Sequence, residues 1–520
     1  MSEAAHGYVL DVPYLGRAYP QHAPIHIHLA ATLAGVEAPS LEPGSAVLEL
    51  GCGYANGLIS AAAAYPRCDF VGVDFNPTHI AAARRRVADL DLANVSLLEA
   101  DVVDLAADPG SLPTFDLVIA HGLYAWIGER EKAAIRSLLK RHVRAGGMVF
   151  LSYNALPGSA GMGVLQRALY EAASLSVGRS DQRLADAITH VKRLRDAKAA
   201  HLTDNALIDS LFESLDEADS AYLIHEYLNA HWTPLYHADV ARDMEAAGLT
   251  FVGSAVPHEV FPDLMLSPDQ KAALGDIPVS SVRETLRDFF IQRVLRKDLY
   301  VRGPRRLTER ARDRALDSLL MCAAVAPDDA DVRVRVPAGR IDLDPPYKAA
   351  LDLLWRDGQA TLRTLLDGPF AGTDQTRAEV VALLTAAAMA YPCLGAPGPA
   401  TVTACHRALA RAVQAVHDEG LQARPGALAV RLGSEIPVSG LEALVLEALA
   451  RGRPADAETL VPEIWAPFEA RGELVMHQGE AVSDPERCRA LLTDMVRAML
   501  PDRLPLWRAL GMVPEGRAAG

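Results

Sequence analysis

Cysteine is scarce in this chain of 520 residues, which holds only six. None of them forms a C-x-x-C pair, and none combines with histidine at the spacing of a zinc site. A disulfide framework and a metal centre are therefore excluded, and we expect free, buried thiols of the kind that a reducing compartment preserves. The six are Cys52, Cys68, Cys322, Cys393, Cys405 and Cys488.

Long apolar runs are also absent. No stretch approaches the roughly 18 uninterrupted apolar residues of a membrane-spanning helix. The N-terminus has no basic segment followed by an apolar one, the pattern of a signal peptide. We therefore expect a soluble, cytoplasmic protein without a membrane span.

Positive charge is in deficit, because 51 Lys and Arg face 66 Asp and Glu, a net charge of −15. An extended nucleic-acid surface is excluded, since phosphate binding depends on clustered Lys and Arg. The one arginine-rich stretch, residues 283–306, interleaves apolar residues such as Phe290 and Leu299 at helical spacing. We expect an amphipathic helix there, with a solvated charged face and internal salt bridges.

The most informative stretch is Ala46–Asp74, AVLELGCGYANGLISAAAAYPRCDFVGVD. It predicts an apolar strand, a glycine turn, an apolar helix and a second strand that ends at an acid. A glycine turn at the carboxyl end of a buried parallel strand lets a ligand approach the backbone closely. An acid at the tip of the next strand, about 20 residues on, can accept hydrogen bonds from both hydroxyls of a ribose. Together these features predict a nucleoside cofactor site.

The spacing of this turn, G-x-G-x-x-x-G preceded by Glu49, distinguishes between cofactors. An acid at that position repels a pyrophosphate but suits a cationic amino-acid tail. The pattern E-x-G-x-G before an acid-tipped strand resembles the S-adenosylmethionine site of class I methyltransferases. An ordinary strand–turn–helix of an α/β protein is the alternative, and the full combination of residues argues against it.

Strands and helices alternate from residue 46 to 157, which predicts a parallel sheet. We expect a helix over 78–89, strands over 95–98, 115–120 and 147–152, and a tight turn at Gly146-Gly147. Residues 158–220 carry helical signals only and predict an inserted cap. Residues 222–256 then restore a strand–helix–strand pattern that we expect to complete the sheet, with a separate small domain as the alternative.

The two ends of the chain are less specific. Near the N-terminus a helix is expected from about Pro24 to Gly35, and His22, His26 and His28 are interpreted as surface or lid residues, because no carboxylate accompanies them. Short helices over 347–355, 361–366 and 375–390 resemble a winged helix. The third offers too little positive charge to read DNA. A protein-contacting role is favoured, with the C-terminal region as a candidate homodimer interface.

The donor site is expected to use residues from three strand ends. Gly51, Gly53 and Gly57 let the backbone approach the amino-acid tail, and Glu49 orients its ammonium. Asp74 holds the ribose. Asp101 accepts from the adenine amine, or alternatively caps the next helix. Phe75 and Val102 sandwich the adenine, and His121 is expected to contact the donor as well.

Acceptor chemistry must lie beside the sulfonium, past the fourth and fifth strands, in loops 121–126 and 153–158. Methyl transfer from a sulfonium needs orientation, desolvation and a neutral nucleophile but no metal. Aromatic side chains there can flank a methylammonium, an amide can accept from an amine, and His121 can take a proton near neutral pH. As alternatives, Trp126 packs the next helix and His121 caps a strand. The candidate catalytic residues are His121, Tyr124, Trp126, Tyr153 and Asn154.

A family resemblance follows from LELGCGYANGLI, FVGVDFNPTHI, FDLVIAHGLYAWI, SYNALPG and HEYLNAHWTPLYHADVARDMEAAGLTFVGSA. In this order they resemble class I methyltransferases that carry a methyltransferase regulatory domain, including the rickettsial protein-lysine methyltransferases that modify outer-membrane protein B. The resemblance covers roughly residues 1–310. It implies S-adenosylmethionine as donor, a Rossmann-like α/β core and, more weakly, lysine acceptors.

Three functions compete on this evidence: a protein-lysine N-methyltransferase, a small-molecule N- or O-methyltransferase of specialised metabolism, and a non-catalytic scaffold. The intact donor motif argues against the scaffold. The expected domains are an N-terminal lid segment (1–45), an S-adenosylmethionine-binding core (46–157), a helical cap insertion (158–220), a sheet-completion and regulatory domain (221–325) and a mostly helical, winged-helix-like C-terminal domain (326–520).

Overall fold

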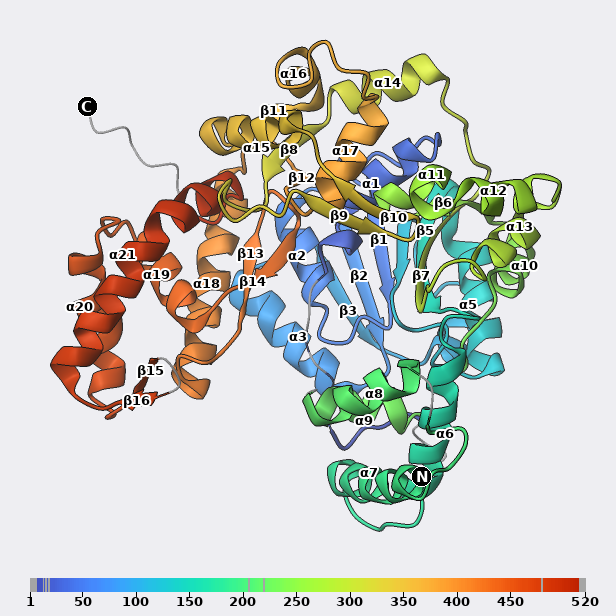
Figure 1. The fold of residues 1–520 in the computed structure, drawn as a ribbon, viewed down its shortest axis with the longest axis horizontal. Helices are drawn as coiled ribbons and strands as arrows, with labels where there is room; N and C mark the ends of the chain where they lie inside the picture. Colours follow the sequence, from blue (N-terminus) through green and yellow to red (C-terminus); the bar gives the residue numbers. More distant parts are fainter. Residues whose placement is uncertain are drawn as a thin grey trace.

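The centre of the protein is a seven-stranded sheet with strand order β3-β2-β1-β4-β5-β7-β6 (Figure 1). The computed structural model describes residues 7–513 except 13, 15, 17, 18, 204, 205, 218, 219, 478 and 479. Strands β1 to β5 are parallel, whereas β7 is antiparallel to both β5 and β6. This confirms the predicted Rossmann-like methyltransferase fold. The strands are β1 Ala46–Leu50, β2 Asp69–Asp74, β3 Val95–Glu99, β4 Phe115–Ala120, β5 Val143–Asn154, β6 Thr250–Ser254 and β7 Leu295–Val301.

Both faces of the sheet are covered, so its strands read as continuous apolar runs rather than alternating ones. Alternate residues of one strand enter different cores: Val47 packs beneath the helices of one face and Leu48 beneath those of the other. Helices α1 Pro24–Leu33, α2 Asn56–Ala64 and α3 Pro77–Leu90 cover the first face. Helices α5 Glu129–His142 and α10 His237–Ala246 cover the second, with the short α4 Val102–Ala107 beside them.

The last two strands of the sheet differ from the sequence prediction. Residues 222–229 lie mostly in helix α9, Ser220–Tyr227, and not in a strand. The strand that completes the sheet beside β5 is β7, which lies inside the arginine-rich stretch predicted as one amphipathic helix. Only α13, Ser280–Arg287, is helical in that stretch. Gly146 and Gly147 lie within β5, where the pairing with β4 shifts its register.

A buried ion cluster explains why the arginines misled the prediction. Arg296 on β7 is 1 % exposed and donates to Asp288 at 2.6 Å and to Asp298 at 3.0 Å. Glu284 on α13 accepts a third bond from Arg296 at 3.1 Å. The charge of Arg296 is neutralised inside the protein by Asp298 of the same strand and by two acids from outside it, so the expected solvated face does not form.

Between β5 and β6 the chain forms a helical cap, at the bottom of Figure 1, from α6 Ala160–Ala173, α7 Ser180–Asp196, α8 Ala206–Glu217 and α9. Leu165, Leu184 and Ile224 share its core with Val9 and Val12 of the N-terminal segment. Between β6 and β7 lie the 3-10 helix η3 Pro257–Val260 and helices α11 Pro262–Met265, α12 Pro268–Gly275 and α13.

The segment after β7 contains the three helices that the sequence predicted, around a three-stranded sheet of order β11-β8-β12 at the top of Figure 1. Two further strands, β9 and β10, pair as a hairpin. The elements are α14 Glu309–Asp317, β8 Leu320–Ala323, β9 Arg333–Val336, β10 Gly339–Asp342, α15 Pro345–Asp357, β11 Ala360–Thr361, α16 Leu362–Asp367, α17 Arg377–Ala386 and β12 Ala390–Pro392.

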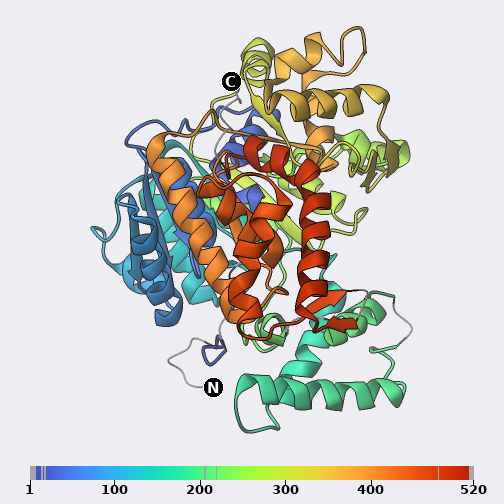
Figure 2. The ribbon, with the colours of Figure 1, turned by 90° about the vertical axis from the view of Figure 1, so that its left-hand side faces the viewer.

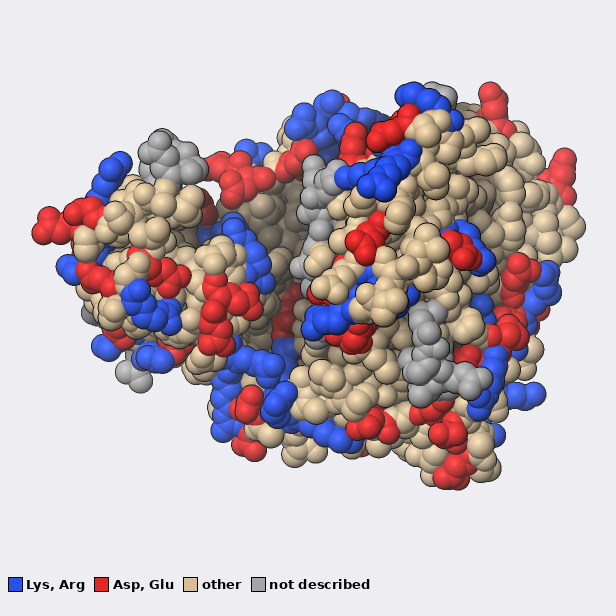
Figure 3. Space-filling view, turned by 90° about the horizontal axis from the view of Figure 1, so that it is seen from below, with Lys and Arg blue, Asp and Glu red and all other residues tan. Residues whose placement is uncertain are grey.

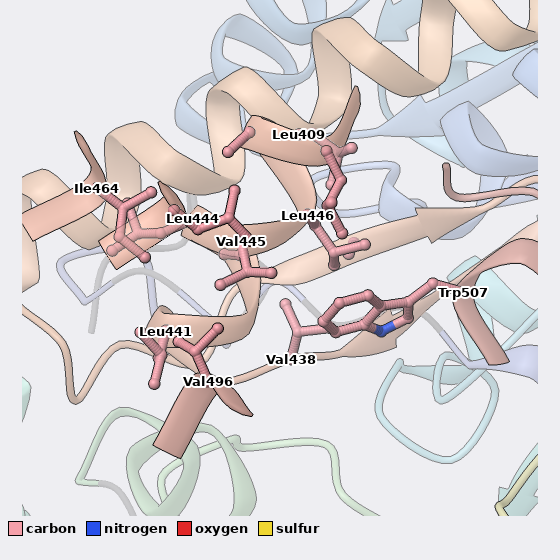
Figure 4. Close-up of a cluster of buried hydrophobic side chains, with 14 of the residues drawn as sticks. Leu409, Val438, Leu441, Leu444, Val445, Leu446, Ile464, Val496 and Trp507 are labelled. Carbon is pink, nitrogen blue, oxygen red and sulfur yellow. The ribbon is translucent and has the colours of Figure 1, made fainter. Parts of the chain in front are cut away.

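The C-terminal lobe has its own apolar core, in which Leu446, Val438 and Trp507 meet (Figure 4). Its first helix, α18, runs along α2 and α3, as Figures 1 and 2 both show. A buried ion pair between Arg86 and Glu435 joins the lobe to the sheet domain. The lobe comprises α18 Pro399–Glu419, β13 Gly426–Ala429, β14 Ser434–Pro437, α19 Gly440–Ala450, α20 Ala457–Glu469, β15 Val475–His477, β16 Glu480–Val482 and α21 Pro485–Ala509.

The surface carries mixed charge, and acidic and basic side chains are interspersed on the face seen from below (Figure 3). In the part of the chain that the structure describes, no helix combines the length and apolar character that crossing a membrane requires. All six cysteines are free and buried. No group of three metal-ligating side chains lies together within the described ranges.

Candidate donor and acceptor site

The loop between β1 and α2 takes a shape that glycine makes accessible. Gly51 and Gly53 have φ of 67° and 54°, in the left-handed region that residues with a side chain rarely adopt. The amides of Gly51 and Cys52 donate to the Val73 carbonyl at 2.8 and 3.0 Å, which fixes the loop to β2. A Cβ on Gly53 or on Gly57 would meet no atom within 4 Å and would project into open space. The loop therefore leaves room for a ligand against its backbone.

Asp74, at the carboxyl end of β2, holds this loop in place. One carboxylate oxygen accepts from the Gly53 amide at 2.8 Å and the other from the Asn76 amide at 2.9 Å. Each oxygen has a second lone pair, and the residue lines a cavity of about 470 Å³. The carboxylate is therefore positioned both to shape the glycine loop and to accept from a ribose.

Glu49, in β1, lies below the same loop and lines an adjoining cavity of about 100 Å³ with Gly51, Gly53 and Gly57. Burial and the nearby Asp74 raise the pKa of Glu49 to about 8. Its Oε2 is buried without a hydrogen-bond partner among the described residues. A buried orphan acceptor is costly, and an ammonium group would satisfy it. This is the fit expected for the amino-acid tail of S-adenosylmethionine.

The predicted adenine contacts lie together in the larger cavity, which Phe75, Asp101 and Val102 all line. Asp101 also accepts from the Val103 amide at 2.8 Å as the N-cap of α4, so the alternative role considered for it is present as well. The ring of Phe75 meets that of Tyr8 edge-on at 5.8 Å. The structure thus places every predicted donor-binding residue on the walls of two adjoining cavities.

Three of the five predicted catalytic residues, His121, Trp126 and Asn154, line the larger cavity. The Oδ1 atom of Asn154 accepts from the indole of Trp232 at 3.2 Å, and the ring of Trp126 lies 5.9 Å from that indole. Trp232 thereby fixes the orientation of both side chains.

His121 cannot take a proton near neutral pH, and that prediction is wrong. Burial, with a smaller contribution from Lys297, lowers the pKa of His121 to about 3. Its Nδ1 forms a 2.7 Å hydrogen bond with the Ser152 hydroxyl, which in turn accepts from the Gly122 amide. The ring also packs 3.9 Å from that of His22. His121 is thus a neutral wall residue.

Tyr124 and Tyr153 lie outside the cavity, so their predicted contact with the acceptor is also wrong. Tyr124 is fully buried, and its hydroxyl donates to Asp243 at 2.7 Å on the side of α10. The hydroxyl of Tyr153 donates to Asp298 at 2.7 Å. Successive side chains of a strand point to opposite faces. With Asn154 in the cavity, Tyr153 must face the other way.

Sequence reasoning missed the cavity residues contributed by other segments. The N-terminal segment supplies Tyr8, Tyr14, Tyr19 and His22, helix α9 supplies Tyr222, His225 and Glu226, and β7 supplies Lys297. The spacing of residues 222, 225 and 226 places them on one face of a helix. Because a strand is predicted over 222–229, the sequence alone does not group these three residues. His22 and His26 are buried and not on the surface, and burial lowers the pKa of His26 to about 4.

Glu226 is the most unusual of these residues. Burial raises its pKa to about 7, although a hydrogen bond with Tyr222 opposes the shift. It lines the same cavity as Trp126 and Asn154. A carboxyl group that titrates near neutral pH can accept a proton there, a property that His121 lacks.

The family comparisons agree with this geometry. Residues 48–149 match the family described as "Methyltransferase domain", and residues 219–302 match the "Predicted methyltransferase regulatory domain". An uncharacterised protein of Synechocystis sp. is 29% identical over 518 residues, covering 97% of this chain and 99% of its own. An uncharacterised protein of Rickettsia prowazekii is 30% identical over 235 residues, which is 42% of this chain and 41% of its own.

Among solved structures, PKMT2 of Rickettsia typhi in complex with AdoHcy has the same fold, with a TM-score of 0.72 and 18% identity. The match covers 96% of this chain and 100% of that one. The likeness shows a shared fold, and the match to the methyltransferase family together with the glycine loop, Glu49 and Asp74 indicates S-adenosylmethionine as the donor. The chain is a class I S-adenosylmethionine-dependent methyltransferase that carries a methyltransferase regulatory domain.

Proposed function

We propose that this enzyme is a protein-lysine N-methyltransferase. The observation that carries the proposal is Glu226, a carboxyl group that titrates near neutral pH in the same cavity as the aromatic rings of Trp126 and Tyr222. A lysine side chain arrives as an ammonium and must lose a proton before it can act as a nucleophile. Aromatic rings and a carboxylate can bind such a cation, and the carboxylate can then accept its proton.

Six residues that line the two cavities have roles in this proposal. When bound, S-adenosylmethionine supplies an activated methyl group on a positively charged sulfur. Glu49 pairs with the ammonium of its tail, and Asp74 with the ribose hydroxyls. Trp126 and Tyr222 flank the incoming lysine, Glu226 accepts its proton, and the carbonyl of Asn154, fixed by Trp232, remains on the wall beside the amine.

Access to the cavity supports a polypeptide acceptor. Three cavity residues, Tyr19, Tyr222 and Val294, are 36%, 38% and 39% exposed, so the cavity reaches the surface beside these side chains. Its volume of about 470 Å³ must hold the adenosyl group as well as the acceptor. The space left suits a narrow side chain whose main chain stays outside. The likeness to PKMT2 of Rickettsia typhi supports the same choice.

A small-molecule N- or O-methyltransferase is the second candidate. The apolar walls contributed by Met162, Val294 and Leu295 favour it, because they would bury a compact apolar acceptor. Such an acceptor would enter the cavity whole and would need no contact with the outer surface.

Labelling separates the two functions. The enzyme is incubated with donor carrying a labelled methyl group and a lysate of the cells that produce it, and protein and small molecules are then separated. The proposal expects label in protein and methyllysine after hydrolysis of that protein. Label confined to the small-molecule fraction would refute it, and an Asp74→Asn variant serves as the control with impaired donor binding.

A further inference from the structure

Helix α13 turns apolar side chains toward the solvent and an acidic side chain, Glu284, toward the protein interior, the opposite of an ordinary amphipathic helix. Its two apolar residues, one apolar residue before it and three after it face the solvent, with exposed fractions between 38% and 57%. We call these six side chains the apolar face of α13: Val279, Val282, Leu286, Phe289, Phe290 and Val294. Exposed large apolar side chains that gather on one helix and the segments beside it can mark an interaction site.

Glu284 of this helix and Asp288 just beyond its end face inward and fix its orientation, whereas Arg283 is exposed. Asp288 is 1 % exposed and accepts from Arg293 at 2.7 Å and from Arg296 at 2.6 Å. Glu284 accepts from Arg296 at 3.1 Å, and the Thr285 hydroxyl accepts from the Ala238 amide at 2.8 Å. Turning the helix over would leave buried charges unpaired, which is strongly unfavourable. The apolar face is therefore held toward the solvent by the ion cluster beneath it.

This face reaches the larger cavity, in which we propose that the acceptor binds. Val294 belongs to it and also lines the cavity, directly before Leu295, another wall residue. The Val294 carbonyl accepts from the Ala155 amide at 3.0 Å and from the Ser159 hydroxyl at 2.8 Å, which fixes this edge of the cavity. At the other side of the face, the ring of Phe289 stacks with that of Tyr236. An acceptor that enters past Val294 thus lies against the apolar face.

We propose that the apolar face of α13 binds an extended apolar segment of the protein substrate, next to the lysine that enters the cavity. This inference rests on the proposed function and adds the class of sequence that the enzyme selects. The eight residues of α13 span about 12 Å, the length of about four residues of extended chain. Alternate side chains of an extended segment point the same way. The preferred substrate therefore has two or more apolar residues at alternate positions, within about eight residues of its lysine.

The test uses fluorescent 15-residue peptides with one central lysine. In one peptide alternate flanking residues are Val, Leu or Phe; in the other all flanks are Ser and Gly. Binding to the full chain is measured by fluorescence anisotropy, and methylation by mass spectrometry. The variant is Leu286→Ser with Phe290→Ser, and the matched control is Leu175→Ser, an exposed leucine after α6 in the helical cap.

We expect the wild type to bind and methylate the apolar peptide about tenfold better than the polar one, roughly the gain from burying one large apolar side chain. The double variant should lose this preference and keep its activity on the polar peptide, and the control should retain the preference. Equal use of both peptides by the wild type would overturn this inference but leave the proposed function intact. Methylation of neither peptide, with label only in small molecules, would overturn both.

A second copy of the chain is the alternative occupant, and size-exclusion chromatography with light scattering measures it. If the wild type is a dimer that the double variant converts to a monomer, the face is a subunit interface and the inference is wrong. An unchanged oligomeric state, together with the lost peptide preference, supports it.

Discussion

Asp74→Asn tests the donor site most directly. The carboxylate of Asp74 accepts from the Gly53 and Asn76 amides, and we predict that it also accepts from the ribose of the bound donor. Asparagine has almost the same shape but only one acceptor oxygen and no charge. One amide loses its partner, and the –NH₂ group of the new side chain faces a donor instead.

The expected loss follows from these bonds. A hydrogen bond to a charged group contributes about 1.5–3 kcal/mol, so the affinity for the donor should fall about 10- to 150-fold. Folding should suffer less, by about 1 kcal/mol, because the Gly53 amide is only half-buried and water can replace the lost partner.

Calorimetry with S-adenosylhomocysteine measures the affinity, and thermal unfolding measures the stability. Asp69→Asn is the matched control, because Asp69 begins the same strand at its exposed end and should leave the affinity unchanged. An affinity of the Asp74 variant within twofold of the wild type would refute the assignment of this carboxylate to the donor site.

Three further predictions concern proton transfer, the ion cluster and the C-terminal core. Because the pKa of Glu226 is about 7, its proton-accepting form accumulates as the pH rises, and kcat/KM should increase between about pH 6 and 8. Glu226→Gln should flatten this rise and lower the activity about 100-fold. An unchanged pH profile of the variant would contradict the role of Glu226 as proton acceptor. Asp298→Asn should cost about 3 kcal/mol in urea unfolding near neutral pH, since it removes one of three partners of the buried Arg296. Buried partners hold the pKa of Asp298 below its usual value, so its stabilisation is present above about pH 4 and lost as the pH falls; a cost that did not shrink on acidification would argue against the pairing. Leu446→Ala should cost about 2–5 kcal/mol through the cavity it leaves, with the affinity for S-adenosylhomocysteine unchanged, and a cost under about 1 kcal/mol would show that this core is loosely packed.

Some errors of the sequence prediction have a common cause in long-range pairing. Residues 295–301 are predicted as helix because apolar residues alternate with charged ones there at helical spacing, yet they form a strand, and Arg296 is paired with Glu284 of α13 and with Asp288 just beyond it. Nothing local in the sequence indicates that these charges are buried together. The strand predicted over 222–229 is a helix for a similar reason, since α9 is stabilised by packing against the cap and the N-terminal segment.

The sequence by itself determined the local geometry of the glycine loop, because a strand, a glycine turn and an acid-tipped second strand form a local unit that follows from backbone sterics and spacing. Gly51, Gly53 and Asp74 could therefore be assigned before any coordinates. Only the tertiary structure decided the acceptor side. There Tyr8, Glu226 and Lys297 converge from three distant segments, and burial rather than residue type sets the pKa of His121 and of Glu226. Desolvation depends on everything that packs around a group, which no short stretch of sequence encodes.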